Sequence, residues 1–193
     1  MKAFYKANNF FIVIFKKYKE ISTRSEKIFD LLLPLVVSLI TFLLMDKYLH
    51  YSFEDFTKNF LNINTIILTS TAILAGFNTA SIAVIAGSQS KLVEDLKNTP
   101  ADYDPTESKF SVLIVFFTWS ILIQLFIILI GILANIFAQF FLDSSIKSYL
   151  TPKWIYGLFS LWTFIVIHSV LISFRNTKLL YTFVNFKNND SSN

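Results

Sequence analysis

The chain contains no cysteine, so disulfide bonds and thiolate metal sites are excluded. Charge is scarce, since Asp, Glu, Lys and Arg make up 16% of the 193 residues, whereas an average soluble domain is nearer a quarter charged. The four glycines form no phosphate-cradling loop. With 54% hydrophobic residues, a water-soluble chain of this length would expose far too much apolar surface. The composition therefore predicts an all-α, polytopic membrane protein.

Four apolar stretches are long enough to cross a bilayer. We expect one transmembrane domain over residues 30–175, with spans at about 28–48, 65–88, 110–135 and 154–174. The third stretch stays uncharged as far as Leu142, so its helix must tilt, kink or project from the bilayer. The aromatic-rich residues 46–64 predict an interfacial loop. Residues 176–193 predict a cytoplasmic tail.

Residues 1–29 predict a basic amphipathic helix, because apolar residues recur every three or four positions from Phe4 to Ile21. One interpretation is a helix on the anionic cytoplasmic leaflet, and the other is a helix packed on its own bundle. In the first, which we favour, the lysines that contact lipid headgroups are Lys2, Lys6, Lys16, Lys17 and Lys19. Pro34 predicts a bend between this helix and the first span.

Positive charge is distributed unevenly between the two sides of a four-span chain. One side receives both termini and residues 89–109, and with them 13 of the 17 lysines and arginines. The positive-inside rule then places both termini in the cytoplasm, with the chain in the inner membrane. The 89–109 connection predicts a hairpin whose Asp104-Pro105 pair starts the next helix. Its acidic residues predict a docking surface for a cytoplasmic protein: Glu94, Asp95, Asp102, Asp104 and Glu107.

The second span, Thr65–Ser88, differs from an ordinary apolar helix because one face is small and the adjacent face is polar. Small residues let another helix backbone approach closely, so we expect this span to be the central packing helix and the contact between copies of the chain. The residues of this small face are Ala72, Ala75, Gly76, Thr79, Ala80, Ala83 and Gly87.

A polar stripe inside the membrane is the second feature of the spans. It comprises Thr71, Asn78 and Ser81, with Gln124, Asn135 and His168 from the later spans. Asn78, expected near mid-membrane, either lines a wet path or pins two helices together, and we favour the pin. His168 is either a proton switch or a neutral side chain hydrogen-bonded to Asn, Ser or Gln of a neighbouring helix. We favour the neutral form because no carboxylate is expected near it.

Little chemistry is available in this chain. We expect no Asp, Glu, Lys or Arg deep in a span, which disfavours proton-coupled transport. No catalytic, cofactor, metal or nucleic-acid motif is present, so we expect a non-enzymatic protein without cofactor or metal. Its expected partners are membrane lipids, further copies of itself and a cytoplasmic protein. The alternative function is a pore or channel lined by the polar stripe.

The layout of the chain offers one resemblance. Spans around Leu31–Met45, Thr65–Ser88, Phe110–Asn135 and Trp154–Phe174, with cytoplasmic termini, resemble the small four-helix membrane subunits of bacterial anti-phage defence systems, such as that of Kiwa. The resemblance implies a homo-oligomeric membrane sensor that works with a cytoplasmic effector. It rests on size and layout, and it transfers no functional residue.

Overall fold

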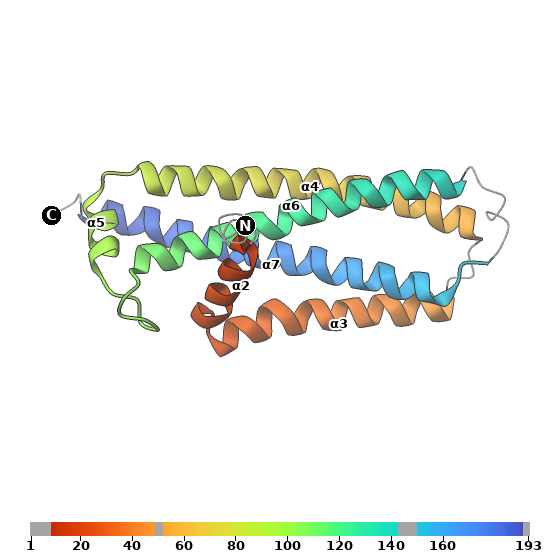
Figure 1. Ribbon diagram of the computed structural model, residues 1–193, viewed down its shortest axis with the longest axis horizontal. Helices are drawn as coiled ribbons and strands as arrows, with labels where there is room; N and C mark the ends of the chain where they lie inside the picture. The colour runs from red at the N-terminus through yellow and green to blue at the C-terminus, as the bar shows by residue number, and fades with distance from the viewer. Residues whose placement is uncertain (1–8, 49–51, 143–149, 191–193) are drawn as a thin grey trace.

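The structure is a computed structural model that describes residues 9–48, 52–142 and 150–190, with side chains as far as residue 181. These residues form six helices, labelled α2 to α7 in Figure 1. Four of them are long and apolar enough to cross a membrane, which confirms the all-α class with four spans. The helices are α2 (Phe10–Ile21), α3 (Arg24–Tyr48), α4 (Phe53–Gly87), α5 (Lys91–Asn98), α6 (Lys109–Leu142) and α7 (Lys153–Asp190).

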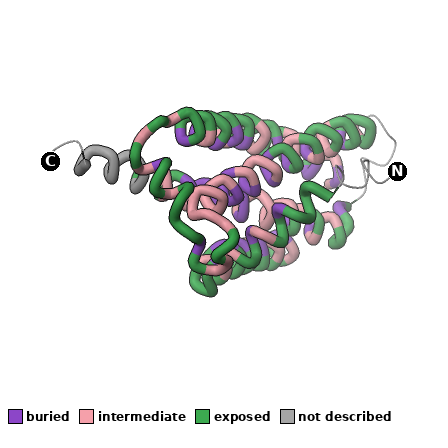
Figure 2. Tube along the Cα trace, turned by 60° about the vertical axis from the view of Figure 1, so that its left-hand side comes forward, coloured by how far each residue is buried: buried purple, intermediate pink, exposed green. Residues whose placement is uncertain are grey.

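The four long helices form an elongated bundle of two pairs. α4 packs along α6, and α3 packs along α7 (Figure 1). The short helix α2 crosses the bundle and packs on α6. We call the end where α4 gives way to α5 the α5 end, and the end where α3 stops and α7 begins the Trp154 end. Figure 2 shows buried residues along the inward faces of the helices and exposed residues along the outward faces.

The prediction of a loop over residues 46–64 is wrong beyond Ser52, because α4 begins at Phe53. Ser52 caps this helix: its hydroxyl accepts a hydrogen bond from the Asp55 N–H at 3.1 Å and donates one to the Asp55 carboxylate at 2.7 Å. This reciprocal arrangement satisfies a backbone donor that the first turn would otherwise leave free. The aromatic residues assigned to the loop, such as Phe56 and Phe60, lie in the first turns of α4.

The predicted bend at Pro34 is also wrong. The chain turns at Ser22–Thr23, where Thr23 and Glu26 form a capping box: the Thr23 N–H donates to the Glu26 carboxylate, and the Glu26 N–H donates to the Thr23 hydroxyl. The described part of residues 1–29 is thus divided between α2 and the start of α3. Pro34 lies buried inside α3, which runs through it. Proline deprives the carbonyl four residues earlier, that of Asp30, of its helical partner, and His168 takes that place at 2.6 Å.

Two further boundaries differ from the sequence prediction. α6 begins at Lys109 rather than at Asp104, because Ser108 accepts from the Ser111 N–H, while Asp104 closes a separate turn by accepting from the Thr106 N–H at 2.9 Å. The helix of the fourth span does not end near residue 174, since α7 continues to Asp190 and makes most of the predicted tail helical.

Candidate functional site

The two unusual faces of α4 point in different directions, one into the bundle and one outward. Its polar residues Asn64, Thr71, Asn78 and Ser81 are buried inside the bundle. Its small face is exposed, except for buried Ala75. A Cβ added at Gly76 or Gly87 would meet no atom within 4 Å. The expectation that the second span is the central packing helix is wrong: α6 takes that place, since it packs on α2, α4, α5 and α7, whereas α4 packs mainly on α6 through its polar face and leaves its small face uncovered.

Asn78 forms the centre of a cluster of fully buried polar side chains. Its amide nitrogen donates to Ser120 and Gln124 at 3.1 Å and to Ser173 at 3.2 Å, and its carbonyl accepts from Asn176 at 3.2 Å. A bond of 2.7 Å between Gln124 and Ser173 completes the link between α6 and α7. The Asn78 cluster, comprising these five residues, has the geometry of a pin that joins three helices.

A second cluster lies closer to the Trp154 end. The Asn64 amide donates to the Gly131 carbonyl at 2.9 Å and to Asn135 at 2.7 Å, and it accepts from the Trp162 indole at 3.1 Å. Gly131 packs closely here, because a Cβ would lie 2.5 Å from the end of the Leu68 side chain, which would have to shift. Asn64 lies two turns before Thr71 on the polar stripe of this helix, so the periodicity that predicts Thr71 and Asn78 also marks Asn64.

The positions of these two clusters along the helices differ from the expectation that Asn78 lies near mid-membrane. Ser38, near the middle of α3, exchanges hydrogen bonds with Ser160 of α7 at 2.6 and 2.7 Å. Trp162 is two residues further on, so its partner Asn64 lies level with the middle of α3, the shortest of the four spans. Asn78 bonds to Asn176, which lies about four turns further along α7, level with the first turns of α3.

A buried ion pair is the clearest feature that sequence reasoning missed. Arg175 donates to the Asp30 carboxylate at 2.6 Å, and their side chains are 11% and 2% exposed. The Tyr18 hydroxyl of α2 donates to the same carboxylate at 2.7 Å. The Arg175 guanidinium also lies 4.3 Å from the ring centroid of Phe116. This group therefore ties α2, α3, α6 and α7 together. Asp30 and Arg175 lie at the ends of their apolar stretches, so the expectation that no charged residue lies deep in a span stays a prediction.

His168 belongs to the same region. Its Nδ1 lies 2.6 Å from the backbone carbonyl of Asp30, and its ring stacks on Phe164 with centroids 6.1 Å apart. The expected partner type, an Asn, Ser or Gln side chain, is wrong, since Pro34 leaves a carbonyl free that the ring N–H can satisfy. His168 is thus a hydrogen-bonded structural residue, although a carboxylate, contrary to expectation, lies nearby.

α2 packs on the bundle, as the second interpretation of the N-terminal region proposed. Tyr18 stacks on Trp119 at 5.3 Å, and Ile14 is buried beside it. Burial raises the pKa of Tyr18 to about 12. Its other side presents exposed apolar residues, among them Phe10, Ile12 and Val13, beside exposed Lys16 and Lys19. The predicted headgroup residues Lys2 and Lys6 lie outside the described residues.

Lys17, by contrast, forms an ion pair with Glu107, which also accepts from the Ser111 hydroxyl at 2.6 Å. The hydrogen bond from Lys17 lowers the pKa of Glu107, and the same bond raises the pKa of Lys17. The pair fastens α2 to the start of α6. It also engages one predicted headgroup residue and one predicted docking residue with each other.

The other acidic residues of the 89–109 connection differ in exposure. Glu94, Asp95 and Asp102 are exposed, and Asp102 has only a long contact of 3.5 Å with Lys109. Asp104 is turned toward its own loop, where the backbone hydrogen bond from Thr106 lowers its pKa. Three of the five predicted docking residues therefore remain available to a partner. Within the described residues, no three metal-ligating side chains gather into a site.

These features define the class of the protein: an all-α chain whose four apolar helices mark it as a multi-pass membrane protein. No protein-family model, curated protein or solved structure matches the chain.

Proposed function

We propose that this chain is a non-enzymatic membrane subunit that self-associates through the small face of α4 and binds a cytoplasmic protein at its α5 end. One observation carries the proposal: the small face lies uncovered on the outside of the bundle, while the polar face is already used within the chain. A pore lined by the polar stripe has no comparable support, since Asn78 and Gln124 bond side chains of the same chain.

The small face suits a second helix better than it suits lipid. Ala72, Gly76 and Ala80 follow one another at four-residue spacing, as do Thr79, Ala83 and Gly87. Two such rows leave a shallow groove of about 20 Å in which another backbone can approach closely. Helix association in membranes depends on this van der Waals packing, because lipid and side chains are equally apolar. Ile73 and Val84, exposed on the adjacent stripe, have no such groove.

The proposed orientation places the α5 end on the cytoplasmic side of a bacterial inner membrane. The 13 lysines and arginines assigned to that side support it, as does α2, whose exposed apolar face and flanking lysines suit the lipid interface. Exposed Glu94, Asp95 and Asp102 then face the cytoplasm. In the setting that the layout resemblance implies, the partner is an effector of anti-phage defence.

Cysteine crosslinking in membranes tests the self-association directly, because the chain has no native cysteine. Ala80→Cys is expected to form disulfide-linked dimers under mild oxidation, since the helices approach within reach of a disulfide. Ile73→Cys and Val84→Cys are matched controls, exposed on the same helix, and are expected to crosslink weakly. Equal crosslinking at all three positions, or none at Ala80, would contradict the proposal.

A second experiment fills the groove. Ala83→Phe is expected to shift the protein toward monomer in mild detergent, measured by light scattering, whereas Val84→Phe leaves the assembly unchanged. Partner binding is tested separately by co-purification from cells that carry the native neighbouring genes. A Glu94→Lys, Asp95→Lys double variant is expected to lose a cytoplasmic protein that Glu54→Lys, at the Trp154 end, retains. The partner proposal is wrong if all variants recover the same proteins.

A further inference from the structure

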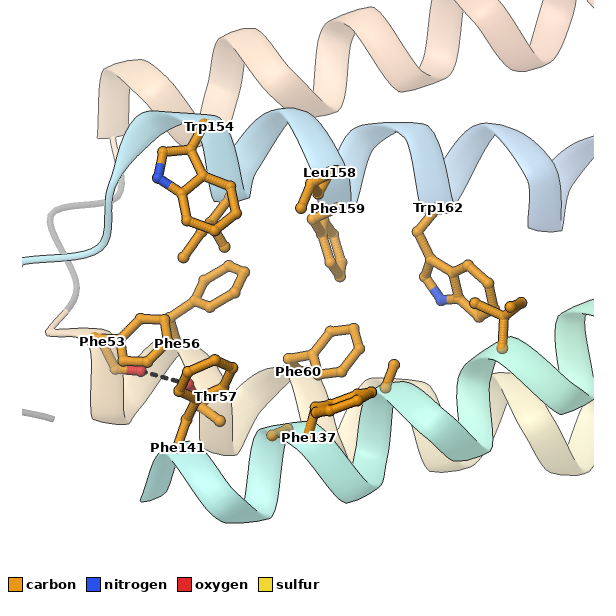
Figure 3. Close-up of a pocket in the computed structure, with 14 residues that line it drawn as sticks. Phe53, Phe56, Thr57, Phe60, Phe137, Phe141, Trp154, Leu158, Phe159 and Trp162 are labelled. Carbon is orange, nitrogen blue, oxygen red and sulfur yellow. Dashed lines mark hydrogen bonds between the residues drawn. The ribbon is translucent and has the colours of Figure 1, made fainter. Parts of the chain in front are cut away.

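A cavity of about 380 Å³ lies between α4, α6 and α7 at the Trp154 end (Figure 3). Phe56, Thr57 and Ala138 form its buried floor. The exposed side chains of Phe137, Trp154 and Leu158 lie at its rim. The cavity therefore opens through the outward surface of the bundle, where a membrane protein meets acyl chains.

Inside its rim, where the exposed Trp154 indole lies, the lining offers no free polar group to a ligand. The Thr57 hydroxyl donates to the Phe53 carbonyl of its own helix at 2.6 Å, and the Trp162 indole donates to Asn64 at 3.1 Å. A cavity without free hydrogen-bonding groups holds water poorly, and a dry cavity of about 150 Å³ already binds benzene. The size and chemistry of this cavity therefore select an apolar occupant more than twice as large as benzene.

The position of the cavity indicates which apolar occupant it takes. Its wall runs along α7 from Trp154 to Trp162, which at about 1.5 Å per residue is about 12 Å. Trp162 lies two residues after Ser160, which bonds Ser38 near the middle of α3, the shortest of the four spans, and Trp154 lies in the first turn of α7. This length is close to one leaflet's share of a hydrocarbon core about 30 Å thick. An acyl chain entering at Trp154 would end near Trp162.

A positively charged side chain, that of Lys153, lies at the entrance of the cavity. Lys153 precedes Trp154, its side chain is 77% exposed, and it pairs with Asp46 of α3 at 2.7 Å. A lipid phosphate at this level would find the exposed ammonium group beside it. We propose that the cavity binds one acyl chain of a membrane phospholipid, with the phosphate next to Lys153. This site lies at the opposite end from α2, and it does not depend on self-association.

Fluorescence quenching by brominated lipids tests the proposal. The chain has three tryptophans, so a Trp119→Phe, Trp154→Phe background leaves Trp162 as the sole reporter at the inner end of the cavity. In phosphatidylglycerol vesicles, lipids brominated near the end of the acyl chain are expected to quench Trp162 more strongly than lipids brominated near the headgroup. Ala138→Phe, which fills the floor, is expected to at least halve the quenching.

Matched variants separate the site from general lipid contact. Ile136→Phe adds the same ring to the exposed side of α6 and should leave the quenching unchanged. If Ala138→Phe does not yield folded protein, Ala134→Leu takes its place, because it fills less of the cavity. Equal quenching in the filled and control variants means contact with bulk lipid only and overturns the proposal, as does the absence of quenching in the unfilled background.

A separate experiment tests whether the phosphate of the bound lipid lies next to Lys153. The same brominated chain is supplied on phosphatidylglycerol, on an uncharged diacylglycerol and as a free fatty acid. Phosphatidylglycerol is expected to quench Trp162 at several-fold lower mole fraction than diacylglycerol, and Lys153→Gln should remove that difference. Quenching by the free fatty acid alone would overturn the assignment to a phospholipid.

Discussion

Replacing Asn78 by leucine tests whether the buried polar cluster holds the bundle together. The substitution removes an amide that donates to Ser120, Gln124 and Ser173 and accepts from Asn176. Gln124 keeps its 2.7 Å bond to Ser173, but its carbonyl oxygen loses the Asn78 amide. Asn176 loses its 3.2 Å bond and retains a 3.5 Å contact with the Phe116 carbonyl.

The size of the expected loss of stability follows from two groups, the Gln124 carbonyl oxygen and the Asn176 side-chain amide. A buried polar group left without a partner costs about 1–3 kcal/mol, so two give about 2–6 kcal/mol. Hydrogen bonds between membrane helices average only about 0.6 kcal/mol, because the helices find other partners when they separate. Gln124 and Asn176 are fully buried, the first losing the partner of its carbonyl oxygen and the second keeping only the 3.5 Å contact, so this cost dominates. We expect Asn78→Leu to lower the free energy of unfolding by about 2–4 kcal/mol.

Unfolding by sodium dodecyl sulfate in mixed micelles, followed by tryptophan fluorescence, measures this change. Thr69→Leu is the control, because Thr69 is exposed and bonds only within its own helix, so its effect should be within about 0.5 kcal/mol. A combined replacement of Asn78, Gln124 and Asn176 by leucine should recover most of the loss, since no partner is then left unpaired. An Asn78→Leu variant as stable as the parent would refute the reasoning.

Three further predictions concern α2 and the contact between α4 and α6. Lys17→Glu should loosen α2 by about 0.5–1 kcal/mol, and adding Glu107→Lys should restore it, as read by hydrogen exchange of α2. Gly131→Ala should leave the bundle about 1 kcal/mol less stable than Gly76→Ala in the same detergent titration, because the new Cβ at residue 131 must displace the end of the Leu68 side chain, whereas nothing lies near the one at residue 76. The raised pKa of Tyr18 means that the folded state holds its proton more tightly, so α2 packing is full below about pH 10 and is lost as the pH rises toward 12. Trp119 fluorescence should follow this loss, and Tyr18→Phe should abolish the pH dependence.

Several helix boundaries could have been read from local signals that sequence reasoning passed over. Ser52 and Asp55 form a capping pair three residues apart, which marks the start of α4, and Thr23 with Glu26 marks the start of α3 in the same way. The aromatic residues after Ser52 and the proline at 34 outweighed these signals in the prediction. Proline is a weak guide here, because the carbonyl it frees is satisfied by His168 from another helix.

The Asp30–Arg175 pair lay beyond sequence reasoning for a different reason. Its members are 145 positions apart, each near the charged end of a span, where a solvated side chain is the ordinary expectation. Only the antiparallel register of α3 and α7, together with α2 folding across them, buries both. Nothing in the local sequence marks the apolar cavity either, since its lining comes from three separate helices.

By itself the sequence determined the membrane class, the four spans and the division of the second span into a small face and a polar face, because hydropathy and helical periodicity are local properties. Tertiary structure alone decided that the polar face turns inward while the small face stays uncovered. It also decided that Asn78 lies level with the first turns of α3 and that Asp30 meets Arg175. These outcomes depend on how far each helix slides and rotates against its neighbours, and that register is set by packing between residues far apart in the chain.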